Sequence, residues 1–519
     1  MSKYYKDKYD VVIIGGALAG LSSAIHLLNN GYDVLVLEQH NLPGGVATSF
    51  VRGGVELEAS LHEMLSVGSK EFPLKIRTFL ESNGVNVEWL QTPIAYRYVT
   101  DKDNVLVHTG EGGNFDRPAR DIADACGDKD NKIYNEVIRF LKFCLHIHDE
   151  CDYLSYKHFS KIKMIKSHLD FVKALGYSYK EVLDSFDLPQ KAKDILSAYW
   201  MYLGSPIDDT PFIVYGYMIA DYLGYGAYIP HHTSHEMSVK MAEAVMNKGG
   251  QIEFGQKVEK ILVKNNKVYG VKTKRGDIIH ADYVISGAYP NTVFSQMIEP
   301  LSEVPKKAIK TVNAMELGVS CFSLIMILDK DYRELGIKDY ATFYAPHGLD
   351  SKDMYEKGKT YNKWNYLTSI CTNTVHEDAT PKGTCFYSIT YLPNGESFKD
   401  VTIENYEEYK NQNIEHFLEL ESNRLGFNIK DHIIEMVVET PITISHYVGA
   451  YMGTIYGYRH MMNNHSAARE EMIDKEHFIK GLFFAGAHQT VGDGMAPAIT
   501  NGEVAAMHLM KMDKRGKKS

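Results

Sequence analysis

The feature that most constrains the fold is a short β-branched run followed at once by glycines and a helical stretch. Residues 9–14 have the apolar pattern of a buried strand, and residues 18–30 have the spacing of a helix that ends at Gly31. A second β-branched run, residues 33–37, ends at Glu38. The order strand, glycine turn, helix, strand predicts an α/β fold with a doubly wound, Rossmann-type domain.

The glycine turn has the spacing of a dinucleotide-binding motif. Its sequence is Gly15-Gly16-Ala17-Leu18-Ala19-Gly20. The first glycine permits the tight turn, the second position lets a pyrophosphate approach, and the last glycine lets helix and strand pack closely. Ala17 holds the second position, so its backbone must accept a Cβ atom. Glu38, at the end of the second strand, is expected to accept hydrogen bonds from ribose hydroxyls.

Composition excludes several classes of protein. A net charge of -10 gives the chain no electrostatic reason to bind nucleic acid. The six cysteines are scattered and lack the paired spacing of metal sites, which is typical of free thiols in a reducing compartment. No run reaches the roughly 18 apolar residues of a membrane span. We therefore predict a cytoplasmic protein; the lysine-rich tail at residues 511–518 is either solvated or contacts an anionic membrane surface.

The pattern along the chain predicts two interleaved domains. Helical spacing dominates residues 70–224, for example at 134–151 and 179–202, whereas short strands return at 251–254, 258–263, 267–272 and 280–286 as a small β-meander. Residues 300–474 mix strands (319–328, 384–391) with a helix at 411–425. We expect a dinucleotide-binding domain made of residues 1–70, 225–300 and 475–519. Residues 71–224 and 301–474 would then form an α+β substrate, or cap, domain.

Further motifs lie beyond the first unit and at the C-terminal end. Residues 43–50 contain a glycine pair, Gly44-Gly45, and lead through a short strand to His62. Residues 481–487 look like a last strand, and Gly494 precedes a last helix that has Pro497 in its first turn. On these residues the chain resembles the FAD-dependent phytoene desaturase, carotenoid isomerase and retinol saturase-like flavoproteins, within the amine-oxidase-like FAD superfamily.

The resemblance implies FAD and assigns residues to it; because no cysteine follows Cys385 to form a covalent linkage, we expect the FAD to be held noncovalently. The glycine pair would lie along the ribityl phosphate, with Val46 where many members have arginine, and the Ser60-Leu61 segment would pass beneath the isoalloxazine ring. The last helix would stabilise negative charge on the reduced flavin. The cofactor residues expected from the motif and the resemblance are Gly15, Ala17, Leu18, Ala19, Gly20, Glu38, Gly44, Gly45, Val46, Ser60, Leu61, Val258, Gly486, Ala487, Gly494, Met495 and Ala496.

Two residues beside the expected flavin are candidates for catalysis. His62 and Glu63 follow the strand that ends under the ring, so they would transfer protons or orient a substrate; a purely structural histidine is an equal alternative. His231, His232 and His235 lie close together, but no cysteine or carboxylate completes a metal site, and residues 233–236 have the pattern of a capping box. We therefore predict no metal.

Tyrosines gather in two segments and bear on the substrate. They lie at residues 215–228 and 447–458, where they line an apolar tunnel or pack in the core. The resemblance implies an oxidoreductase that saturates or desaturates a C=C bond of a small apolar substrate, such as a polyene or fatty acid. Three alternatives remain: a redox-neutral double-bond isomerase that uses reduced FAD, a flavin amine oxidase, and a non-catalytic prenyl-binding protein of the fold of Rab GDP-dissociation inhibitors.

Overall fold

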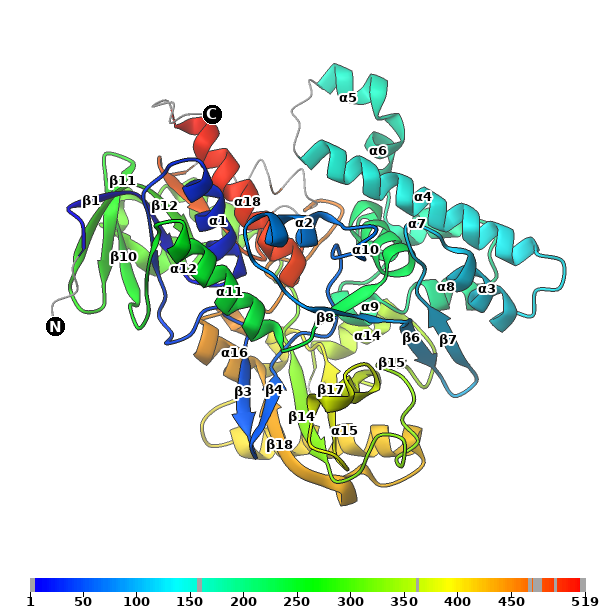
Figure 1. Ribbon diagram of the computed structural model, residues 1–519. Helices are drawn as coiled ribbons and strands as arrows, with labels where there is room; N and C mark the ends of the chain where they lie inside the picture. Colours follow the sequence, from blue (N-terminus) through cyan, green and yellow to red (C-terminus); the bar gives the residue numbers. More distant parts are fainter. Residues whose placement is uncertain are drawn as a thin grey trace.

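Two large β-sheets and a group of helices make up the molecule (Figure 1). The computed structural model describes residues 5–155, 161–360, 364–464, 469, 478–489 and 492–513. Most of the lysine-rich tail, from residue 514 onward, lies outside the described residues. Within them, no helix is both long and apolar enough to cross a membrane.

The first sheet joins segments from both ends of the chain. Its strand order is β13-β10-β11-β12-β1-β2-β9, and β19 pairs with β12. β1 lies in the middle and pairs in parallel with both β2 and β12, while β19 also runs parallel to β12. The Rossmann-type α/β fold is thus confirmed. The strands are β1 (Lys8–Ile14), β2 (Val34–Leu37), β9 (Gln251–Glu253), β10 (Val258–Lys264), β11 (Lys267–Thr273), β12 (Ile278–Ser286), β13 (Ile298–Glu299) and β19 (Leu482–Phe484).

The predicted meander is correct in part. β10, β11 and β12 form antiparallel neighbours, and the first hairpin turns at Asn265 and Asn266, which both have positive φ, 54° and 57°. β9 does not join them. It pairs in parallel with β2, because the helix before it returns the chain to the opposite edge of the sheet.

Two helices from opposite ends of the chain pack closely on this sheet. They are α1 (Leu18–Asn29) and α18 (Met495–Met512). Ser22 Oγ donates to the Ile499 carbonyl and Ser23 Oγ to the Gly502 carbonyl, both at 2.8 Å. A Cβ atom on Gly502 would lie 2.1 Å from the Ala19 carbonyl oxygen, so the helices approach as closely as a glycine allows.

The second sheet has the order β18-β14-β17-β16-β15-β6-β7. One face packs on α15, where Phe417 contacts the rings of Trp364 and Tyr391. Side chains alternate along each strand, so the opposite face is free to border a cavity. The elements are β6 (Ile94–Val99), β7 (Asn104–His108), β14 (Phe322–Leu328), β15 (Ala341–Tyr344), β16 (Leu367–Ile370), β17 (Cys385–Tyr391), α15 (Tyr406–Leu425) and β18 (Ile433–Glu439).

Helices gather beside the second sheet, at the upper right of Figure 1. The helix predicted at residues 179–202 is instead three short helices, because Pro189 interrupts the hydrogen-bond ladder between the first two. The helices of this region are α3 (Asp116–Ala125), α4 (Lys132–Ser155), α5 (Lys161–Ser167), α6 (Leu169–Ala174), α7 (Tyr179–Asp184), α8 (Gln190–Leu196), α9 (Trp200–Leu203) and α10 (Phe212–Tyr225).

Smaller elements connect these parts. Among them the hairpin of β3 and β4 reaches the second sheet. The others are α2 (Lys75–Ser82), β5 (Trp89–Thr92), β8 (Ala227–Pro230), α11 (Ser234–Asn247), α12 (Pro290–Thr292), α13 (Lys306–Asn313), α14 (Ser351–Gly358) and α16 (Pro441–Val448), with β3 at Ser49–Arg52 and β4 at Val55–Glu58. The division into a dinucleotide-binding domain and a cap, with the boundaries given above, remains our proposal.

The contact between α1 and α18 is testable by adding one methyl group. We expect Gly502→Ala to destabilise the protein by about 1–3 kcal/mol, because its Cβ would press on backbone atoms that cannot move freely. Gly176→Ala is the matched control and should change stability much less, because this glycine is exposed, has no positive φ, and its Cβ would meet only the Lys173 carbonyl oxygen, at 3.4 Å. Thermal unfolding of both variants measures the difference, and equal losses would contradict the packing argument.

Candidate functional site

A cavity of about 950 Å³ lies where the first sheet, the second sheet and the helical region meet. Its volume is at the upper end of the range usual for small-molecule sites. Every cofactor and catalytic residue expected from the sequence lines it: Gly15, Ala17, Leu18, Ala19, Gly20, Glu38, Gly44, Gly45, Val46, Ser60, Leu61, His62, Glu63, Val258, Gly486, Ala487, Gly494, Met495 and Ala496.

The glycine turn forms one end of the cavity. Gly15 has a φ of 101°, which favours glycine, and a Cβ atom on Gly20 would lie 2.1 Å from the Gly15 carbonyl oxygen. Ala17 has φ −75° and ψ 172°, an extended conformation that any residue adopts. The methyl group at the second position of the motif is therefore accepted without backbone strain.

Glu38 holds this turn in place. Its carboxylate is buried and accepts hydrogen bonds from the backbone N–H groups of Gly16, at 2.6 Å, and of His40, at 2.7 Å. One bond reaches each carboxylate oxygen, and each oxygen keeps a second acceptor position. Glu38 can thus order the turn and still accept a hydrogen bond from a ribose.

The glycine pair lies directly against the turn. Gly44 and Gly45 have φ of 113° and 65°. A Cβ atom on Gly44 would lie 2.2 Å from the Ala47 carbonyl oxygen, and one on Gly45 would lie 3.0 Å from the Cβ of Ala17. Ser60 Oγ fixes the following residue by donating to the Val46 carbonyl at 2.7 Å.

Two helix N-termini border the cavity without side-chain caps. α1 begins after Ala17 and α18 begins after Gly494, and neither N-cap residue provides a side-chain hydrogen bond. Their first N–H groups are therefore available to oxygen atoms of a ligand. In the described part of the chain the cavity has only two lysine or arginine side chains, Arg52 and Lys257. Backbone N–H dipoles would therefore offset much of the negative charge of a bound phosphate group. These features fit FAD.

His62 lies deeper in the cavity, beside the second sheet. Its ring centroid is 5.3 Å from that of Tyr202, and its Nε2 atom is 3.3 Å from Thr390 Oγ1. Burial lowers the pKa of His62 to about 4. The imidazole is therefore neutral at neutral pH, so it can accept or donate a hydrogen bond but does not hold a positive charge.

Glu63 has the opposite response to burial. Thr92 Oγ1 donates to Glu63 Oε1 at 3.2 Å, while Oε2 is buried with no hydrogen-bond partner among the described residues. Burial raises the pKa of Glu63 to about 8. At neutral pH the group is therefore a neutral carboxylic acid that holds a proton.

The sheet face beneath His62 carries polar residues that the sequence analysis missed. Cys321, Ser323 and Ile325 of β14 and its flank alternate toward the cavity, as do Ser388 and Thr390 of β17. The sequence signal was present, because Ser323, Ser388 and Thr390 interrupt otherwise apolar or aromatic strands at every second position. The same strands pack their other residues on α15.

The two tyrosine segments divide between cavity and core. Tyr222, Tyr447 and Tyr456 line the cavity. Tyr215 and Tyr458 are buried away from it, and both donate hydrogen bonds to interior oxygen atoms. Each of the two interpretations left open by the sequence therefore holds for some of these residues.

The histidine cluster does not form a metal site in the described residues. The ring of His231 lies near those of His232 and His376, at 4.6 and 4.2 Å between centroids, but no group of three ligands among the described residues is arranged for a metal. The capping box predicted nearby is wrong. Thr233 has a φ of 39° and no side-chain cap bond, and the buried carboxylate of Glu58 instead accepts bonds from Ser234 N and Oγ.

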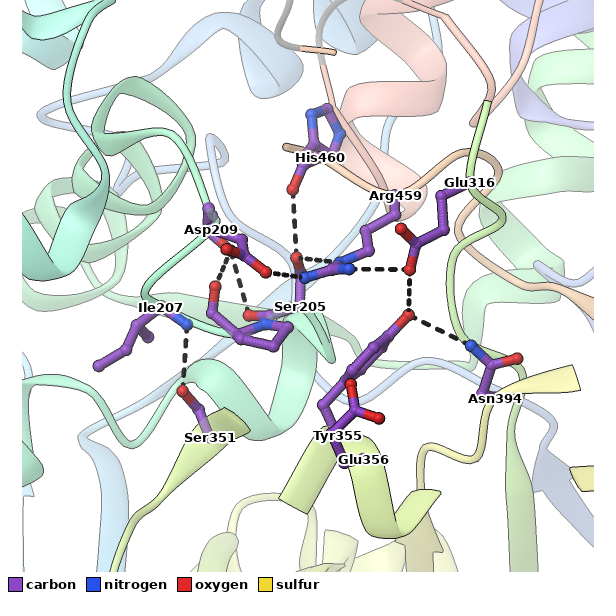
Figure 2. A network of polar contacts seen from close by, with 12 residues as sticks. Ser205, Ile207, Asp209, Glu316, Ser351, Tyr355, Glu356, Asn394, Arg459 and His460 are labelled. Carbon is purple, nitrogen blue, oxygen red and sulfur yellow. Dashed lines mark hydrogen bonds and ion pairs between the residues drawn. The ribbon is translucent and has the colours of Figure 1, made fainter. Parts of the chain in front are cut away.

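A polar network joins Arg459 and Glu316 to the loop that follows α9 in the helical region (Figure 2). Arg459 is buried and donates to Glu316 at 2.8 Å, to Asp209 at 2.5 Å and to Ser205 Oγ at 3.2 Å. Burial alone would raise the pKa of Glu316, but Tyr355 and Arg459 bind its carboxylate and hold that pKa below its ordinary value. Arg459 and Glu316 therefore remain a charged pair although both are at least partly buried.

This network continues toward the start of α18. Ser205 Oγ also donates to the carbonyl of His460, whose Nε2 atom lies 3.2 Å from Asp493 Oδ1. Asp493 lines the cavity immediately before Gly494. A loop of the helical region, the residues around 460 and the last helix are therefore positioned together.

Comparison with known proteins identifies the relatives of this chain. The model of the family described as flavin containing amine oxidoreductase matches residues 18–510. The all-trans-retinol 13,14-reductase of Danio rerio is 24% identical over 506 residues, covering 92% of this chain and 82% of that protein. The 1-hydroxycarotenoid 3,4-desaturase of a Flavobacterium species is 23% identical, covering 95% and 98%. The chloroplastic prolycopene isomerase of Daucus carota is 22% identical, covering 87% and 72%.

Solved structures share the fold. A putrescine oxidase variant superimposes with a TM-score of 0.65 at 12% identity, covering 98% of this chain and 99% of the other. An oxidoreductase from Methanosarcina mazei gives a TM-score of 0.58 at 16% identity, covering 97% and 100%. At such identities the similarity establishes the architecture and not the substrate.

The role of Glu38 is testable through cofactor retention. We expect Glu38→Gln to bind FAD about tenfold more weakly, because an amide has one acceptor oxygen and cannot serve both the Gly16 and His40 N–H groups. Glu259→Gln, at an exposed position of β10, is the control and should bind FAD normally. Titration of apoprotein with FAD measures the affinity, and unchanged binding by Glu38→Gln would contradict the assignment.

Proposed function

Because the chain belongs to the flavin containing amine oxidoreductase family, and is therefore an FAD-dependent enzyme, we propose that it saturates or desaturates a C=C bond of an apolar, polyene-like substrate. The observation that carries this proposal is that His62 and Glu63 line the same cavity as the residues expected to hold FAD and as a group of apolar side chains. That group includes Met201, Met218 and Ile444.

The names of relatives support the choice of substrate. The retinol reductase, the carotenoid desaturase and the prolycopene isomerase all carry names of conjugated, mostly apolar molecules. Amine oxidation is supported less, because the putrescine oxidase variant shares the fold at only 12% identity. We further propose that the protein is cytoplasmic and that any membrane contact is peripheral.

The mechanism assigns separate tasks to the two candidate residues. Bound FAD supplies hydride exchange with a substrate carbon. In the saturating direction Glu63 donates its proton to the neighbouring carbon, and in the desaturating direction its carboxylate accepts one, so that hydride and proton together account for both hydrogens. Neutral His62, hydrogen-bonded to Thr390, orients the substrate, and the buried walls exclude water.

The purified protein tests the function directly. We expect flavin absorbance in the protein as isolated, and release of the flavin on acid precipitation because it is bound noncovalently. Anaerobic incubations with polyenes, unsaturated fatty acids and amines, with the flavin prereduced or oxidised, then identify the reaction. A gain or loss of two hydrogen atoms supports the proposal, an unchanged mass with altered geometry indicates isomerisation, and hydrogen peroxide from an amine indicates amine oxidation.

The proposal is rejected if the isolated protein contains no flavin. It is also rejected if no polyene reduces or oxidises the bound flavin. Absence of bound FAD after reconstitution would favour a prenyl-binding protein instead.

The pH dependence of saturation tests Glu63 as the proton donor. Activity should fall as pH rises through about 8, because Glu63 then loses the proton it must donate. Glu63→Gln should lower kcat by about 100-fold or more, and the activity that is left should no longer fall as pH rises through about 8. Thr92→Val keeps the carboxyl group but removes one of the two interactions, with Tyr202 and with Thr92, that lower the pKa of Glu63, so it should move the fall in activity to higher pH. If the fall in activity near pH 8 persists in Glu63→Gln, Glu63 is not the proton donor.

The same group makes a separate prediction for stability. The pKa of Glu63 is about 8 in the folded protein and ordinary, near 4.5, in the unfolded chain. Unfolding between these values releases a proton, so the contribution of Glu63 to stability is full below about 4.5 and is lost as pH rises to about 8. Glu63→Gln cannot ionise. Its free energy of unfolding relative to the wild type should therefore rise over this pH window in denaturant titrations.

A further inference from the structure

Glu439 is a buried acid in the cavity with no task in the reaction above. It is the last residue of β18, is 8% exposed and lines the cavity. Its Oε2 atom is buried and has no hydrogen-bond partner among the described residues. A buried polar atom left unpaired is costly, which indicates that another molecule completes its bonding.

The residue begins a row of polar groups that crosses the second sheet. Glu439 is opposite Ser323 of β14, and Ser323 is opposite Thr390 of β17. Ser323 Oγ is 2.7 Å from Thr390 Oγ1, which in turn is 3.3 Å from His62 Nε2. The polar row, defined as Glu439, Ser323, Thr390 and His62, therefore runs along the cavity floor to the candidate catalytic histidine.

Apolar residues flank the row. Ile325 of β14 and Val437 of β18 form the next pair on the same face of the sheet, and both line the cavity. Ile444 of α16 also lines it. A wholly hydrocarbon substrate would contact these side chains equally well but would leave the bonding of Glu439 incomplete. The row thus distinguishes between apolar molecules that differ by a single polar group.

Glu439 is uncharged in this setting. Burial, followed by repulsion from Glu58, raises its pKa to about 8. A neutral carboxyl group both donates and accepts hydrogen bonds, so its natural partner is a hydroxyl or carbonyl group and not a cation.

We propose that Glu439 is a specificity-determining residue that binds a hydroxyl or carbonyl group of the substrate, so that the protein selects oxygen-bearing polyenes over pure hydrocarbons. This inference rests on the proposed function and narrows its substrate class. Ser323 adds a second hydroxyl beside Glu439, and the row as a whole fixes how far the chain of the substrate advances toward His62.

Binding of matched ligands tests the inference without requiring turnover. The probes are a polyene that ends in a primary alcohol, the same polyene ending in a methyl group, and the same polyene ending in an amine. Equilibrium dialysis against FAD-loaded protein gives the three dissociation constants. The wild type should bind the alcohol about tenfold more tightly than the methyl form, the difference expected when a buried polar group loses its partner.

The variants separate the role of Glu439 from a structural one. Glu439→Leu should bind the alcohol and the methyl form equally, whereas Glu439→Gln should keep most of the preference. Ser323→Ala should reduce the preference and covers the case in which the leucine variant does not fold. Glu435→Gln, which lies on the same face of β18 outside the cavity lining, is the matched control and should behave as the wild type.

Three results would overturn the inference: a preference for the alcohol that persists in Glu439→Leu, a loss of FAD instead of ligand preference in that variant, or tighter binding of the amine that depends on Glu439. Failure of the proposed function is recognised separately. Protein that binds the alcohol through Glu439 but neither reduces nor oxidises any polyene rejects the reaction alone, and protein that turns over hydrocarbons without preference rejects the inference alone. No binding of any probe rejects both.

Discussion

The close approach of α1 to α18 is the contact on which the site depends. Gly502 lies against the backbone of α1, and serine hydroxyls of α1 bind carbonyls of α18. The N-termini of both helices border the same cavity, one after Ala17 and the other after Gly494. A shift between these helices would move one half of the expected cofactor site relative to the other.

Local patterns identified residues from distant parts of the chain that line one cavity. The glycine turn, Glu38 and the first residues of the last helix are set by short-range geometry, in which a particular φ or a strand end requires a particular residue type. The break at Pro189 was also visible in the sequence, but apolar spacing continued across it and favoured one helix. The pairing of β9 with β2 could not be read locally, because strand partners far apart in sequence are chosen by packing.

The polar residues that the second sheet contributes to the cavity were missed, for a physical reason. Ser323, Thr390 and Glu439 come from three strands that meet only through sheet register, so no spacing in the sequence joins them. The protonation states of the titratable groups in the cavity also depend on burial in the folded protein. Desolvation keeps the imidazole of His62 neutral, with a single N–H, and keeps Glu63 and Glu439 protonated, so these three groups are all uncharged at neutral pH. Such a lining is compatible with an apolar ligand, whereas three ionised groups would not be.

The first sheet cannot be completed during synthesis until β19 has been made, because β19 pairs with β12. A ribosome that adds about 5–20 residues per second needs roughly 20 to 90 s to pass from the end of β1 to the start of β19. Throughout that interval the face of α1 that α18 later covers has no partner, and the cavity lacks the lining that the start of α18 contributes. Synthesis of α18, and not emergence of the N-terminal motif, therefore sets the earliest moment at which the cavity can be complete.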